Sequence, residues 1–184
     1  MKMKLWLILL SLCVFMLFAC GSDHGTTSDT TDGSGSFRSV TETGFPKAPP
    51  NMIVVCGEES VTAWRGTYSW HVLLDNGMGS GKHADSFHPL TAGDAVPVIT
   101  AGDGAEVTLV FEIPAEVPLP LTSLEVRRYP ADAEAHEDYE TVTAEGGVLT
   151  LTEDNALYEV IAAWDVSDGA YSGTAHYAFR TAEE

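Results

Sequence analysis

Period-two alternation of apolar and polar residues is the sequence feature that most restricts how this chain can fold. The four clearest alternating runs cover residues 67–74, 105–113, 156–166 and 173–180. Alternation of this kind is typical of a strand with one buried face. In the third run the apolar face is Tyr158, Val160, Ala162, Trp164 and Val166. Glu159 falls on the opposite face, so we expect it to face solvent and its replacement by Ala to cost under about 0.5 kcal/mol.

Shorter runs extend the same strand pattern along the chain. Turn-forming residues such as Asp-Asn, Gly-Gly and Asp-Gly separate these runs, and no helical periodicity stands out. Many short strands at this spacing favour two packed antiparallel sheets. We therefore predict an all-β fold, an antiparallel β-sandwich over residues 52–184. The six shorter predicted strands are Met52–Cys56, Ser60–Trp64, Ala95–Thr100, Thr122–Tyr129, Glu140–Ala144 and Val148–Thr152.

The first 19 residues are typical of a signal peptide. Lys2 and Lys4 precede an apolar run over residues 5–19, which is shorter than the roughly 20 residues that span a bilayer. The segment 17–20, Leu-Phe-Ala-Cys, resembles a bacterial lipobox. That resemblance implies cleavage before Cys20 and a diacylglycerol on its sulfur, so we expect a lipid-anchored protein on the extracellular face of the cell membrane. The alternative is an ordinary secretory signal.

Residues 20–51 form a polar, low-complexity segment that contains too few apolar residues to bury a core. We predict a lipidated cysteine followed by a disordered linker between the membrane and the sandwich. Once residue 13 is removed and Cys20 is acylated, Cys56 is the only remaining thiol, so no intramolecular disulfide can form. Cys56 ends an apolar run and is expected to pack as a small hydrophobic residue.

The charge of the chain excludes one class of partner. Twenty-seven acidic residues stand against nine Lys and Arg, giving a formal net charge of −18. Nucleic-acid binding relies on neutralising phosphates with basic side chains, so no nucleic-acid partner is expected. Membrane contact is expected through the lipid on Cys20 alone.

Two segments hold candidate ligands for a divalent metal. His83, Asp85 and His88 lie close together in one polar stretch, and a set of His and carboxylate ligands can bind zinc. The acidic segment 132–140 could attract a cation or a basic partner. Both segments also fit ordinary solvated loops. His71 and His176 fall on polar strand faces, and no role is predicted for them.

Catalysis has little support in the sequence. Asp85, Ser86 and His88 include the residue types of a hydrolase triad, but such triads are assembled in space rather than by adjacency, and no G-x-S-x-G motif accompanies them. No H-E-x-x-H zinc motif is present either. We expect no cofactor and no enzyme activity, with a hydrolase as the least favoured alternative.

Two resemblances add to this interpretation. The last two alternating runs, Tyr158-x-Val-x-Ala-x-Trp164 and Gly173-x-Ala-x-Tyr-x-Phe179, resemble the final strands of immunoglobulin-like and fibronectin-III-like domains. Together with Arg-Gly-Thr-Tyr-Ser-Trp at 65–70 and Ala-Asp-Ser-x-His-Pro-Leu at 84–90, they resemble a group of uncharacterised surface lipoproteins of low-GC Gram-positive bacteria. A similar segment ends some membrane metallopeptidases of the β-lactam-sensor type, outside their zinc-binding part. The resemblance implies an extracellular module and carries no activity with it.

The sequence thus predicts a membrane-anchored extracellular lipoprotein that acts as a non-enzymatic binding or sensing module for a protein, peptide or cell-wall ligand. The alternative is a divalent-metal-binding module that uses His83, Asp85 and His88 or the acidic segment 132–140.

Overall fold

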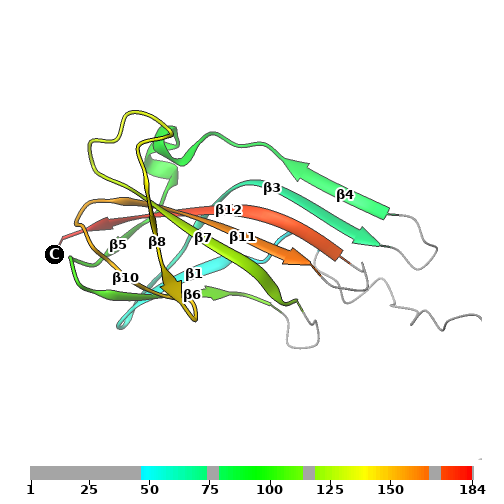
Figure 1. Ribbon diagram of the computed structural model, residues 1–184, viewed down its shortest axis with the longest axis horizontal. Coiled ribbons are helices and arrows are strands. Elements are labelled where there is room, and N and C mark those ends of the chain that lie inside the picture. Colours follow the sequence, from blue (N-terminus) through cyan, green and yellow to red (C-terminus); the bar gives the residue numbers. More distant parts are fainter. Residues whose placement is uncertain (1–46, 74–78, 114–118, 166–170, 184) are drawn as a thin grey trace, which may run out of the picture. The chain divides into compact units, whose positions relative to one another are not determined.

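The computed structural model describes residues 47–73, 79–113, 119–165 and 171–183. The predicted signal peptide, Cys20 and all but the end of the predicted linker lie outside these residues. In the described part the fold is all-β, with two sheets packed together and no α-helix (Figure 1). None of the described residues belongs to a helix long and apolar enough to cross a membrane.

The smaller sheet has five strands. Their order is β2 (Glu59–Thr62), β1 (Met52–Cys56), β6 (Glu106–Phe111), β10 (Val148–Thr150) and β9 (Ala144–Glu145). All of these neighbours pair antiparallel.

The larger sheet has seven strands and carries the site described below. Six of them follow the order β4 (Gly79–Ala84), β3 (Trp64–Leu73), β12 (Tyr171–Ala182), β11 (Leu157–Asp165), β7 (Leu121–Tyr129) and β8 (Glu140–Val142). The seventh, β5 (Val98–Thr100), pairs parallel with the end of β12. Each of the ten predicted strands overlaps a strand of the structure, whereas β4 was not predicted and β9 was not predicted as a separate strand.

The core lies between the two sheets and confirms the predicted inner faces. Tyr158, Val160, Ala162 and Trp164 of β11 are at most 1% exposed, and Val166 lies outside the described residues. Large aromatic side chains fill the centre, where the rings of Trp70 and Trp164 meet edge to face with centroids 5.7 Å apart. The smaller sheet contributes buried aliphatic residues: Met52, Val54, Val107, Leu109 and Leu149.

The outer face of the larger sheet is covered at one end. Two short 3-10 helices, η1 (Pro89–Thr91) and η2 (Gly93–Ala95), lie there beside the connection from β7 to β8 (Figure 1). A second, smaller apolar cluster forms under this cover from Val96, Tyr129, Leu157 and Ala178, with Trp64, Leu90, Ala92, Ala133 and Tyr139 packed against it. Glu159 is therefore 3% exposed, and the prediction that it faces solvent is wrong.

A bulge in the β3–β12 pairing divides β3 between the two faces. The register shifts between Ala175 and Tyr177, so the regular alternation of β3 is interrupted there. Trp70 reaches the main core, whereas Trp64 packs against the second cluster on the outer face.

The point where the chain enters the sandwich is held by two side chains of the larger sheet. Arg65 donates a hydrogen bond from Nη1 to the carbonyl of Pro49 at 2.7 Å. The buried hydroxyl of Tyr177 donates to the carbonyl of Pro50 at 2.6 Å. Burial raises the pKa of Tyr177, so this hydroxyl remains a donor at any physiological pH. The residues just before β1 are thereby attached to β3 and β12.

Candidate functional site

Histidines gather on one face of the molecule. The sequence has six, and the five that the structure describes all lie on or over the outer face of the larger sheet. Three of them belong to strands: His71 to β3, His83 to β4 and His176 to β12. His88 precedes η1, and His136 lies in the connection from β7 to β8. Because His71 and His176 each alternate with buried inward side chains, they point away from the core.

Glu159 is the centre of the covered part of this face. Its Oε1 lies 2.9 Å from Nδ1 of His176, and the hydroxyl of Tyr129 donates to its Oε2 at 3.1 Å. Nη1 of Arg127 lies 3.7 Å from the same Oε2. The register explains this grouping, because Arg127 is directly opposite Glu159 in the β7–β11 pairing. Both carboxylate oxygens thus have partners, as a buried charge requires.

The surroundings lower the pKa of Glu159. Burial alone would raise it, but the hydrogen bond and the charge of His176, the hydrogen bond from Tyr129 and the charge of His88 together outweigh burial. The carboxyl group is therefore ionised at neutral pH. The same carboxylate, with burial as the larger cause, raises the pKa of Tyr129, so the phenol stays protonated and continues to donate.

His88 connects the cover to this centre. Its Nδ1 accepts a hydrogen bond from the amide of Leu90 at 3.3 Å, which caps η1. An accepting Nδ1 places the ring proton on Nε2, which lies 3.3 Å from the Tyr129 hydroxyl. A chain of donors then runs from His88 through Tyr129 to Glu159. Burial lowers the pKa of His88, the nearby Glu159 opposes this, and the charges of His136 and Arg127 add to the lowering.

Two further contacts hold the β7–β8 connection over the sheet. The ring of His136 stacks on His88, with centroids 3.8 Å apart and planes 12° from parallel. The guanidinium of Arg127 lies 4.6 Å from the ring centroid of Tyr139 and is bonded through Nε to Glu125 at 2.6 Å. The first contact joins the β7–β8 connection to the segment that begins η1, and the second attaches it to β7.

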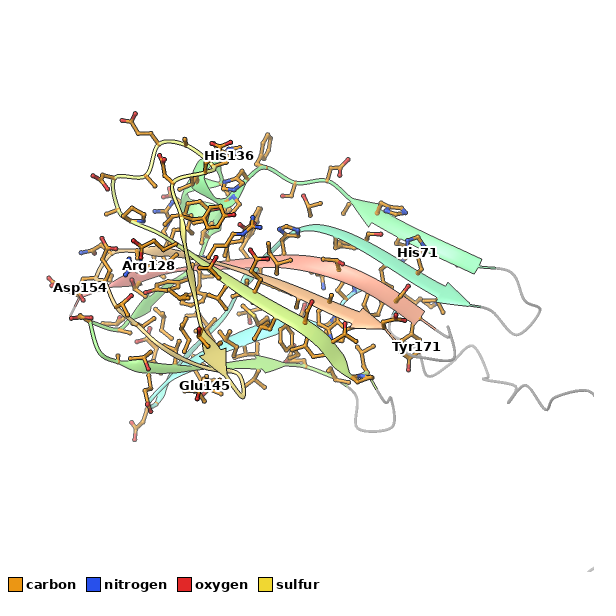
Figure 2. All side chains as sticks on the ribbon, in the orientation of Figure 1. His71, Arg128, His136, Glu145, Asp154 and Tyr171 are labelled. Carbon is orange, nitrogen blue, oxygen red and sulfur yellow. The ribbon has the colours of Figure 1, made fainter. Side chains whose placement is uncertain are left out.

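The other end of the outer face is open. His71 and His83, from neighbouring strands, are both exposed, and their ring centroids lie 5.1 Å apart. Oγ of Ser69 lies 3.1 Å from Nε2 of His71. Figure 2 shows His71 on β3, well away from His136 above the covered end.

The three residues predicted as a metal site do not come together. His83 lies beside His71, Asp85 is exposed in the segment after β4, and His88 contacts Tyr129 and His136. Across the described residues, no group of three or more His, Cys, Asp or Glu is placed to hold a metal ion.

The acidic segment and the backbone of Ser86 have local structural partners. Asp138 accepts hydrogen bonds from the amides of Glu134 and Ala135 at 3.3 and 2.9 Å, which closes the loop on itself. The amide of Ser86 donates to Oγ1 of Thr67 at 3.1 Å. Cys56, at the end of β1, is a free, half-buried thiol packed against the main core.

The residues that organise the covered end were not predicted as a site. No role is predicted for His176 from sequence, and Glu159 is predicted to face solvent. One signal was present in the sequence: Glu159 stands in a strand whose other residues from 157 to 164 are all apolar. A carboxylate in such a strand requires partners once the second face is covered.

Comparison with protein-family models, with curated proteins and with solved structures gives no match for this chain.

Proposed function

We propose that this chain is a lipid-anchored lipoprotein of the Gram-positive cell surface, and that its sandwich is a non-enzymatic binding or sensing module. The observation that carries the proposal is the outer face of the larger sheet. There a buried, hydrogen-bonded charge cluster fixes a cover at one end, and exposed polar side chains form a platform at the other. The ligand class is a protein, a peptide or a cell-wall component.

The geometry of the cluster favours binding over catalysis. Glu159 and His176 resemble the orienting pair of a hydrolase, but a triad also needs a nucleophile hydrogen-bonded to the histidine. Among the described residues, His176 hydrogen-bonds to Glu159 and to no serine, threonine or cysteine side chain. The cluster instead holds the cover and the sheet in one arrangement, which keeps a binding surface preorganised.

The strand order supports an immunoglobulin-like assignment for the sandwich. One sheet contains the order β1, β6, β10, which matches strands A, B and E of such domains. The other contains β8, β7, β11, β12, which matches C′, C, F and G. In this assignment the four strands β2 to β5 are inserted between A and B, and the β3–β4 hairpin extends the larger sheet beyond strand G.

The membrane anchor is tested at Cys20, whose thiol is the group that would be acylated. Cys20→Ser should leave the chain unlipidated and shift it from the membrane fraction to the medium or to an uncleaved precursor. Detergent partition and gel mobility report this change. A variant that partitions like the wild type would refute the anchor.

The binding face is tested by photo-crosslinking on intact cells. A benzophenone amino acid at Thr174, on the outer face of β12, should give one discrete adduct. The matched control is Thr108, an exposed threonine on β6 of the smaller sheet. Equal adducts from both positions, or none from Thr174, would contradict the assignment of the face.

A further inference from the structure

The open end of the outer face carries a pair of histidines on adjacent antiparallel strands. In the β3–β4 pairing, His71 is opposite Gly81 and His83 is opposite Ser69, so the two histidines are diagonal neighbours on one face. Diagonal neighbours in a sheet lie within reach of each other's long side chains. Both side chains are exposed, which leaves their ring nitrogens open to a ligand from solvent.

Gly81 leaves a small space that both rings face. A Cβ atom built on Gly81 would lie 3.0 Å from Nδ1 of His71 and 3.6 Å from Nε2 of His83. Two imidazole nitrogens therefore approach the same point from different strands, with the ring planes 71° apart. Any residue other than glycine at this position would fill the space with its own side chain.

Ser69 supplies the remaining element of a ligand site. Its Oγ lies 3.1 Å from Nε2 of His71, on the nitrogen that does not face Gly81. Metal-binding histidines commonly donate their other ring N–H to a fixed acceptor, which sets the tautomer and leaves the ligating nitrogen unprotonated. With Nε2–H donated to Ser69, Nδ1 of His71 is the unprotonated nitrogen, and the ring edge that carries it lies beside the space above Gly81, with Nδ1 3.0 Å and Cε1 3.2 Å from the Cβ position.

We propose that Nδ1 of His71 and Nε2 of His83 bind one first-row transition-metal ion, Cu(II) most tightly, with water completing its coordination. Imidazole nitrogen suits Cu(II), Ni(II) and Zn(II), and Cu(II) leads the affinity order for such sites. Calcium and magnesium prefer oxygen ligands and are not expected here. The net charge of −18 concentrates cations around the chain.

This site goes beyond the proposed binding function and does not depend on it. It shares only His83 with the metal set predicted from sequence. Asp85 and His88 are not ligands in this proposal. The ring of His88 lies at the covered end, where its two nitrogens contact the amide of Leu90 and the hydroxyl of Tyr129.

The test is a CuCl₂ titration of the full-length chain in detergent, purified without a histidine tag. Equilibrium dialysis gives stoichiometry and affinity, and electron paramagnetic resonance shows nitrogen ligation. All variants carry His24→Ala, which removes the linker histidine as a competing ligand. We expect one Cu(II) per chain. His71→Ala and His83→Ala should each weaken binding by at least about tenfold, since loss of even an outer hydrogen-bond partner of a ligand costs about 10–100-fold.

Gly81→Ala keeps both imidazoles and places a methyl group between them, so it should weaken Cu(II) binding as well. His136→Ala, at another exposed histidine, is the matched control and should leave the affinity unchanged. Unaltered circular dichroism and melting temperature will show that each variant is folded. Copper binding that survives in His71→Ala and His83→Ala would overturn the proposal. The proposal would also be overturned if Asp85→Ala or His136→Ala lost as much Cu(II) affinity as His71→Ala and His83→Ala.

Discussion

The two faces of the larger sheet are built by different rules. The inner face is apolar over β11 and the middle of β3 and β12, where the opposing sheet buries it. The outer face is divided: side chains around Glu159 lie under η1, η2 and the β7–β8 connection, whereas His71 and His83 lie in the open. Strand pairing places all of these outer residues on one side, but cover contributed by segments distant in sequence decides which of them are buried. A face of a sheet is thus not a uniform environment.

The largest expected effect is on the inner face. Trp164 is 1% exposed and packs edge to face against Trp70 and Phe111. Trp164→Ala removes this packing and leaves a cavity, so the free energy of unfolding should fall by about 3–5 kcal/mol. Chemical denaturation measures the change. A loss below about 1 kcal/mol, the typical effect of a point mutation, would show that the inner face is not packed as described.

The next largest loss of stability is expected at the covered end of the outer face and not at its open end. Glu159→Ala leaves His176, Tyr129 and Arg127 without their shared acceptor, and should cost about 2–4 kcal/mol. The matched control is His71→Ala, on the same face but exposed, which should cost less than about 0.5 kcal/mol.

Equal losses for Glu159→Ala and His71→Ala would remove the distinction between a covered and an open end. Glu159→Gln sharpens the comparison. The amide fills the same space without the charge, so it should recover part of the stability lost in Glu159→Ala.

The smallest expected effect is a pH dependence confined to the covered end. The pKa of His88 is lowered in the folded state from its ordinary value of 6.5, so the unfolded chain takes up the proton first as the pH falls. Neutral His88 therefore contributes to the free energy of unfolding. This contribution is complete above pH 6.5 and is lost as the pH falls through the pKa of His88 in the folded state. Because His88 is only half-buried, we expect less than about 1 kcal/mol.

His88→Asn keeps a capping side chain for η1 but does not titrate. Urea unfolding at several pH values should show a shallower loss in this variant than in the wild type between pH 7 and 5.5. Below that range Glu159, whose folded pKa lies below 4.5, adds a second loss that Glu159→Gln should abolish. If the free energy of unfolding fell with pH in the same way in the wild type and in both variants, His88 and Glu159 would not be the groups that cause the pH dependence.

Most of the sandwich was predictable because alternation of apolar and polar residues directly indicates a strand with one buried face. Tyr158, Val160, Ala162 and Trp164 follow it without exception. Strand β4 was not predictable, because Gly-Ser-Gly-Lys-His-Ala has no apolar alternation and forms a strand only by pairing with β3. The burial of Glu159 depends on the 3-10 helices and the β7–β8 connection. The apolar run around Glu159 indicated a strand with two buried faces, but it did not identify which segments supply the cover.

The candidate site was predictable only in its residue types. Histidine and carboxylate were the residue types predicted as ligands, but Glu159 and His176, which pair in the structure, were not among the predicted residues. Spacing along the chain did not identify the spatial partners, because they come from other strands and connections. His83 has its partner on β3, and His88 has its partners on β7 and in the β7–β8 connection.

The attachment of the entry segment has a mechanical consequence. A protein anchored at Cys20 and bound to a ligand on the outer face would transmit tension through the residues just before β1. Arg65 and Tyr177 hold the carbonyls of Pro49 and Pro50, so part of the load passes to β3 and β12 before it reaches β1. β1 itself is flanked by β2 and β6, and a pull along its axis loads both ladders in shear. Under such tension the hydrogen bonds of Arg65 and Tyr177 would be among the first to be loaded, at the end of the sandwich where residues 47–51 enter.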